Sequence, residues 1–162
     1  MPFTPYHFGP SGFVGLVFRK WLDIPVFVLA NVIVDVEVLF AEGWPYHRHW
    51  HWHTLLVGGV VGAAWAVTAY PLRNLFKKIM RIFRLPYATG FWKMVFSGVL
   101  GVWLHVLIDS IYHYDVQIFW PLKSNPLYRV LAPKTVLLIC VISFIPVIVL
   151  YVITVRSQIR KK

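Results

Sequence analysis

Long apolar runs separated by short polar and basic segments dominate the chain, a pattern typical of membrane-spanning helices. Residues 135–155 contain no charged side chain, and about 20 apolar residues are enough to cross a hydrocarbon core of about 30 Å. The pattern predicts helices over residues 12–21, 25–40, 49–70, 91–113 and 134–155. We therefore predict one all-α domain over residues 1–162, an integral membrane bundle of about five helices.

Local signals place several helix ends. Asp23 can accept amide hydrogens from a helix that begins near Pro25, because aspartate is a favoured N-cap and proline suits the first turn. Pro71 ends the third helix, and Pro146 predicts a kink in the fifth. The third helix carries small residues that permit close packing, namely Gly58, Gly59, Gly62, Ala63 and Ala64.

A basic segment, residues 72–85, separates the third and fourth predicted helices. Its cations are Arg73, Lys77, Arg81 and Arg84, and its apolar residues on another helical face are Leu72, Phe76, Ile79 and Phe83. This pattern predicts an amphipathic helix that lies on an anionic membrane surface. The alternative interpretation is a solvated basic loop that only sets the topology.

Composition supports the membrane assignment. The 162 residues are 59% hydrophobic and 14% charged, with a mean hydropathy of +0.66, whereas soluble domains average about a quarter charged residues. A domain of this size has too little interior to bury the apolar excess, so lipid must cover it. Cys140 is the single cysteine, which excludes a disulfide framework within the chain and a cysteine zinc site.

Charge predicts the orientation in the membrane. With five crossings, twelve of the sixteen Lys and Arg fall on one side, in residues 19–20, 73–93 and 156–162. The positive-inside rule then predicts a multi-pass plasma-membrane protein with its N-terminus outside and its C-terminus in the cytoplasm. Because the cations lie at helix ends, the net charge of +10 indicates membrane lipids as partners and not nucleic acid. We expect no secretory signal peptide, because residues 1–10 lack a basic start.

Histidines and acids are scarce, and most gather at the predicted outer face. They form four groups: His7; Asp35 with Glu37; His47, His49, His51 and His53; and His105, Asp109 and His113 with Asp115. Ionisable groups in membrane helices are costly and usually pair, line water or bind something. Four groups at one depth predict a metal site, and imidazole with carboxylate suits zinc or a similar divalent ion.

Spacing narrows the candidates. His105 and Asp109 are four residues apart and project from one helical face. Asp35 and Glu37 are two apart and face different directions, so at most one is expected to bind directly, and Asp35 is preferred. The histidine run allows two pairs with a spacing of four, His49 with His53 or His47 with His51. The alternatives are hydrogen-bonded packing residues and a loose surface metal trap.

These residues resemble a family of bacterial inner-membrane proteins described as metal-dependent hydrolases, some of them under DNA-damage control, that are related to zinc-dependent phospholipase C. The resemblance covers nearly the whole chain up to Pro126. It lies in residues 4–10 (TPYHFGP), 30–37 (ANVIVDVE), 47–54, 105–110 (HVLIDS) and 119–122 (FWPL). Each segment is weakly specific by itself, whereas their order and spacing together are fairly specific.

The resemblance implies metal ligands at His7, Asp35, His105 and Asp109 and at a histidine pair from residues 47–54. The family places its two histidines four or five apart, whereas the His-Arg and His-Thr elements here are six apart. The pair is therefore His49 with His53 or His47 with His51. We favour His49 and His53, because Thr54 and the leucines after it continue the family element.

The predicted function is a membrane-embedded metal-dependent hydrolase of a phosphoester or phospholipid-like substrate at the outer face. A divalent ion would lower the pKa of bound water toward about 7, and Asp35 or Asp109 would orient or deprotonate that water. Arg48 would hold the phosphate through bidentate contacts, or would serve only as a headgroup anchor. The alternatives are a non-enzymatic membrane protein with a structural, sensing or transport metal site, and a lipid-binding scaffold without metal.

Overall fold

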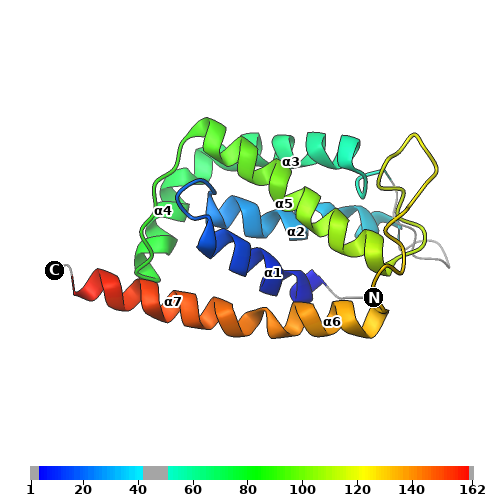
Figure 1. The fold of residues 1–162 in the computed structure, drawn as a ribbon. Helices are drawn as coiled ribbons and strands as arrows, with labels where there is room; N and C mark the ends of the chain where they lie inside the picture. Colours follow the sequence, from blue (N-terminus) through cyan, green and yellow to red (C-terminus); the bar gives the residue numbers. More distant parts are fainter. Residues whose placement is uncertain (1–3, 42–50, 161–162) are drawn as a thin grey trace.

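The computed structural model describes residues 4–41 and 51–160, where all regular structure is helical (Figure 1). The elements are α1 (Thr4–Val17), α2 (Ile24–Ala41), α3 (Leu55–Ala69), the 3-10 turn η1 (Tyr70–Leu72), α4 (Arg73–Ile82), α5 (Phe91–Tyr112), α6 (Pro133–Ile142) and α7 (Phe144–Ile159). Because α3 continues through η1 into α4, and one residue separates α6 from α7, the described helices form five stretches. The predicted all-α bundle of about five helices is confirmed.

Three of these stretches are long and apolar enough to cross a membrane: Leu55–Ile82, Phe91–Tyr112 and Pro133–Ile159. Along the last of them, Ile145 and Ile148 are each 61% exposed and Ile153 is 58% exposed. An outward-facing apolar surface of this extent needs a cover, and lipid supplies it. That α1 and α2 also cross the membrane stays a prediction.

Helix α5 lies at the centre of the bundle and contacts α1, α2, α3 and α6. In Figure 1, α1, α2, α3 and α5 run side by side, α6 and α7 follow α1, and α4 turns across one end. Glycines permit the central approach, because a Cβ on Gly62 or Gly98 would collide with the carbonyl of the other. The predicted close packing through small residues of the third helix is confirmed.

The basic segment is a helix, as predicted, but of its four predicted apolar residues only Phe76 is buried, while Leu72, Ile79 and Phe83 are exposed. Phe76 and Met80 of α4 are buried, and Phe76 packs with Ala69 and Met94, whereas Lys77 and Arg81 are exposed. The solvated-loop interpretation is therefore wrong. Helix α4 lies at one end of the bundle with the α1–α2 connection and the C-terminal end of α7, while the start of α1 and the end of α5 lie at the other (Figure 1).

The first helix begins earlier than predicted, at Thr4, and ends at Val17. The prediction of residues 12–21 was wrong because Gly9 and Pro10 weaken a helix by local propensity. Tertiary packing outweighs that preference here. A Cβ on Gly9 would collide with the carbonyl of Cys140, so the glycine lets α1 lie directly against α6.

The third helix begins later than predicted. Residues 51–54 form a turn and bend, and α3 starts at Leu55. Thr54 has extended backbone angles (φ −129°, ψ 158°), and its side chain accepts the amide hydrogen of Val57 at 3.1 Å. This is a helix N-cap, and it leaves His53 in the preceding connection.

The predicted start of the second helix is confirmed, and the final stretch has a break near the predicted kink at Pro146. Asp23 precedes α2, and its Oδ1 accepts the amide hydrogen of Val26 at 3.3 Å. The final stretch is interrupted between α6 and α7 at Ser143, one turn before Pro146. Proline has no amide hydrogen to donate to the carbonyl four residues earlier, which favours a break in this turn.

Candidate metal centre

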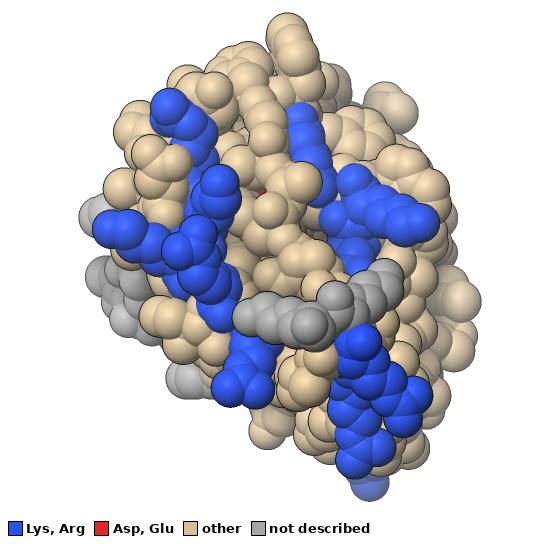
Figure 2. Space-filling view, turned by 90° about the vertical axis from the view of Figure 1, so that its left-hand side faces the viewer, with Lys and Arg blue, Asp and Glu red and all other residues tan. Residues whose placement is uncertain are grey.

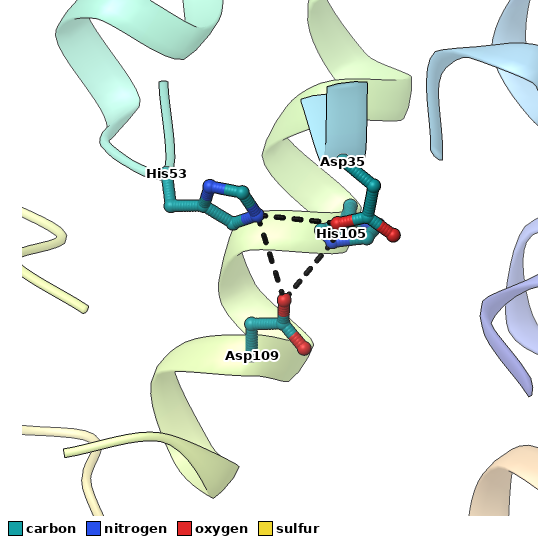
Figure 3. A group of neighbouring side chains, drawn as sticks. All are labelled: Asp35, His53, His105 and Asp109. Atoms are coloured by element: carbon teal, nitrogen blue, oxygen red, sulfur yellow. Dashed lines mark hydrogen bonds and ion pairs between the residues drawn. The ribbon is translucent and has the colours of Figure 1, made fainter. Parts of the chain in front are cut away.

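Four side chains from three segments converge on one another (Figure 3). Asp35 comes from α2, His53 from the turn before α3, and His105 and Asp109 from successive turns of α5. Each residue offers one ligand atom, and the four atoms lie within 4.8 Å of one another. The predicted sharing of one face by His105 and Asp109 is confirmed, since His105 Nε2 lies 3.0 Å from Asp109 Oδ2.

The four atoms all lie within 4.8 Å of one another, and four of their six separations are 3.0–3.8 Å. His105 Nε2 lies 3.1 Å from Asp35 Oδ1, and His53 Nε2 lies 3.3 Å from the same oxygen. His53 Nε2 lies 3.8 Å from Asp109 Oδ2. Four N and O ligands about 2.0–2.2 Å from a tetrahedral zinc ion are separated by about 3.3–3.6 Å. The donor set therefore suits a divalent ion.

Glu37 is not one of the four residues, but it contacts one of them, His53. Its Oε2 lies 3.0 Å from His53 Nδ1, and both of its oxygens accept the amide hydrogen of Trp52 at 3.2 Å. A carboxylate that accepts a hydrogen from Nδ1 favours the tautomer in which Nε2 is the ligand atom, and it orients the ring. Asp35 and Glu37 therefore contact the two opposite nitrogens of the same imidazole, Nε2 and Nδ1 of His53.

His7 lies against the opposite edge of Asp109. His7 Nε2 is 3.1 Å from Asp109 Oδ1, and the His7 ring stacks on His105 with centroids 4.1 Å apart. Ser11 donates to the carbonyl of His7 at 2.6 Å, and the Asn31 amide donates to Ser11 at 3.0 Å. His7 is therefore positioned beside the four-atom group, and its own role as a ligand stays a prediction.

The family comparison agrees with this architecture. The model of the YdjM inner membrane protein family matches residues 22–161. The chain belongs to the YdjM inner membrane protein family. No curated protein and no solved structure matches it significantly. The YdjM match begins after His7 and contains the four residues of the group, Asp35, His53, His105 and Asp109. The match confirms the predicted location in the inner membrane, whereas the orientation of the termini stays a prediction.

Burial in this YdjM-family chain is uneven across the group. His53 and His105 are fully buried and Asp109 is 2% exposed, whereas the side chain of Asp35 is 20% exposed. Asp35 is therefore the most accessible member of the group. The connection after α5 covers part of this end, because Ile118 packs on Val34 and Val106 and its carbonyl accepts the amide hydrogen of Leu55 at 3.0 Å.

The histidine run is only partly described. His53 belongs to the four-atom group, and His51 is exposed with its ring edge-on to Trp120 at 5.2 Å. Of the predicted candidates, Arg48 and His49 lie outside the described residues, as does His47. Because α3 starts at Leu55, the prediction that His49 and His53 project from one helix was wrong for His53.

The contribution of Glu37 was missed in the sequence. Its position two residues after Asp35 indicated only that it faces away from Asp35. The available signal was the cost of placing a second acid in an apolar helix, since such an acid is expected to have a partner. That partner, His53, is 16 residues away in sequence.

Proposed function

We propose that this membrane protein is a metal-dependent hydrolase that cleaves a phosphoester in a lipid or another amphipathic substrate at the membrane surface. The observation that carries the proposal is the meeting of two imidazole nitrogens and two carboxylate oxygens within 4.8 Å. Such a cluster in an apolar bundle is costly unless its members are paired or bind something. The resemblance to relatives of zinc-dependent phospholipase C supports hydrolysis as the purpose.

The role proposed for each residue follows from how deeply its side chain is buried. His53, His105 and Asp109 are the deeply buried donors and would hold the ion, because catalytic zinc sites use three protein ligands and keep one position open. When bound, a divalent ion supplies acidified water and a polarised phosphoryl oxygen. Asp35 is the most exposed of the four donors, so it would orient the attacking water and accept its proton.

A pocket of about 610 Å³ adjoins the turn that carries His53 and offers room for a substrate headgroup. Its wall includes Thr54 and, from the connection after α5, Lys123 and Asn125. Binding pockets for small molecules measure about 300–1,000 Å³. Lys123 can attract a phosphate as a point charge, and Arg48 keeps its predicted role as a second phosphate contact.

The decisive experiment is Asp35→Asn in the full chain. We expect metal content near that of the unmodified protein, measured by elemental analysis, and at least a hundredfold slower hydrolysis of short-chain phospholipids or bis(p-nitrophenyl) phosphate. Loss of one proton-transfer group typically costs a factor of about 10²–10⁴ in rate. Asp109→Asn serves as the comparison, because it should lose metal and hydrolysis together.

A structural or sensing metal site is the second candidate. It is favoured by the closeness of Asp35 Oδ1 to both imidazoles, 3.1 and 3.3 Å, because a fourth protein ligand would close the site. In that case Asp35→Asn would lose metal and thermal stability, and the unmodified protein would hydrolyse none of the phosphoesters offered.

A further inference from the structure

A second concentration of charge lies at the end of the molecule opposite the candidate metal centre. A pocket of about 540 Å³ opens there between α4, the 83–90 connection and the C-terminal end of α7. Lys77, Arg81 and Arg84 line it, together with Tyr87 and Gln158. Figure 2 shows Lys and Arg gathered over this end face, with Asp and Glu almost entirely hidden.

The three cations of this basic pocket have no anionic partner in the described part of the chain. Lys77, Arg81 and Arg84 are spaced by four and three residues, so their charges repel one another. None of them forms an ion pair among residues 4–41 and 51–160. The acid at this end, Asp23, accepts hydrogens from Tyr87 and Thr89. A bound anion would relieve the repulsion.

Arg84 occupies a position that usually belongs to glycine. Its φ is 54°, in the left-handed region where a Cβ is unfavourable. The amide of Arg84 donates to the carbonyl of Arg81, and that of Leu85 donates to the carbonyl of Met80, both at 2.9 Å. These bonds define a Schellman helix end, which favours glycine at this position. The arginine is present despite a conformational cost, and it places a guanidinium at the pocket.

The wall of the basic pocket is held in place by the buried core. Tyr87 donates its hydroxyl hydrogen to Asp23 Oδ2 at 2.7 Å, and Thr89 donates to the same oxygen. Burial, with a smaller contribution from Asp23, raises the pKa of Tyr87, so the phenol stays protonated and keeps its bond. Asp23 is itself fully buried at the start of α2. A pocket fixed in this way loses little conformational entropy when it binds.

We propose that the basic pocket binds the phosphate of an anionic phospholipid headgroup. Arginine and lysine are the residues that recognise phosphate, arginine through paired hydrogen bonds. Exposed apolar side chains lie beside the cations: Ile159, which lines the pocket, is 54% exposed, and Ile82 and Phe83, next to Arg81 and Arg84 in sequence, are 77% and 52% exposed. A free phosphate would gain nothing from this apolar rim, whereas the acyl chains of a lipid would cover it. The proposal does not depend on the hydrolase function.

Lipid binding can be counted on the full chain in detergent by native mass spectrometry with phosphatidic acid or phosphatidylcholine of equal chain length. We expect one bound phosphatidic acid per chain and weaker binding of phosphatidylcholine. The double variant Arg81→Gln/Arg84→Gln should bind phosphatidic acid at least tenfold more weakly, because each cation near a membrane surface contributes about fivefold. The double variant Lys20→Gln/Lys78→Gln removes the same charge from exposed residues outside the pocket and should change binding less than twofold.

Arg84→Gly separates binding from folding, because it should raise the melting temperature while weakening phosphatidic acid binding. An equal loss in the two double variants would mean diffuse attraction to the whole basic face and would overturn the proposal. Displacement of the lipid by an equal concentration of inorganic phosphate would assign the pocket to free phosphate. Displacement by an equal concentration of a glutamate-rich peptide would assign it to an acidic protein, and either result would overturn the lipid assignment.

Discussion

Asp109 is the residue through which the candidate metal centre is connected, because its two oxygens contact different partners. Oδ1 lies 3.1 Å from His7, and Oδ2 lies 3.0 Å from His105 and 3.8 Å from His53. Asp109 is only 2% exposed. Its negative charge can balance a cation, and its two oxygens orient three imidazoles.

Asp109→Asn is therefore expected to abolish most metal binding while the bundle stays folded. The change keeps the side-chain volume and removes the negative charge. Losses in the outer shell of a metal site typically cost about 10–100-fold in affinity, and loss of a direct ligand should cost at least as much. Metal per chain, measured by elemental analysis after purification in detergent, gives the result. His51→Ala should keep its metal, because His51 is exposed and lies outside the four-atom group. Equal metal content in wild type and Asp109→Asn would contradict the assignment.

At the scale of elements, the site depends on how closely α5 approaches its neighbours. Gly62 on α3 and Gly98 on α5 meet backbone to backbone, and Gly101 meets the carbonyl of Phe27 on α2 in the same way. Helix packing in membranes relies on such small residues because no hydrophobic driving force operates between helices in lipid. Since His105 lies two turns beyond Gly98 on α5, the same contact sets where the imidazole stands relative to His53.

Gly98→Ala should destabilise the protein and reduce its metal content. The new Cβ would collide with the carbonyl of Gly62, and overpacking of this kind costs about 1–3 kcal/mol. Gly15→Ala is the matched control, because its Cβ would meet Phe27 at an ordinary 3.6 Å. Both changes also add helix propensity, up to about 1 kcal/mol in favour of alanine in a helix interior, so a lower melting temperature for Gly98→Ala than for Gly15→Ala reports the collision. Scanning fluorimetry of the purified variants measures it, and equal melting temperatures would show that α3 and α5 separate without cost.

At the scale of the whole molecule, the basic pocket and the candidate metal centre lie at opposite ends of one bundle. The basic pocket lies beside α4 and the end of α7, and the four-atom group lies near the end of α5. The stretches between them include three that can cross a membrane. The two ends would therefore face different aqueous compartments and different leaflets.

The distribution of charge predicts which compartment each end faces. Positive residues are retained on the cytoplasmic side, so the C-terminus should be protected from protease added to spheroplasts, and an N-terminal tag should be cleaved. The experiment uses one tag at a time on the full chain, with a detergent-permeabilised sample to show that each tag is cleavable. A protected N-terminal tag in intact spheroplasts would reverse the orientation and place the metal centre in the cytoplasm.

The sequence by itself determined the features that depend on residues close together along the chain. The apolar runs predicted the membrane helices, and the helical spacing of the basic residues predicted α4. The spacing of His105 and Asp109 placed both on one face, because a helix repeats every 3.6 residues. The separation of the cations from the histidines also followed, since the order of the helices sets which ends lie together.

Only the tertiary structure decided how the segments meet. His53 reaches Asp35 and Glu37 because Thr54 caps α3 and leaves the histidine in a turn, and this contact joins residues 16 and 18 positions apart. The early start of α1 depends on contact between Gly9 and α6. In each case local helix propensity predicted a different structure or gave no prediction. Packing between distant segments contributed the larger free energy.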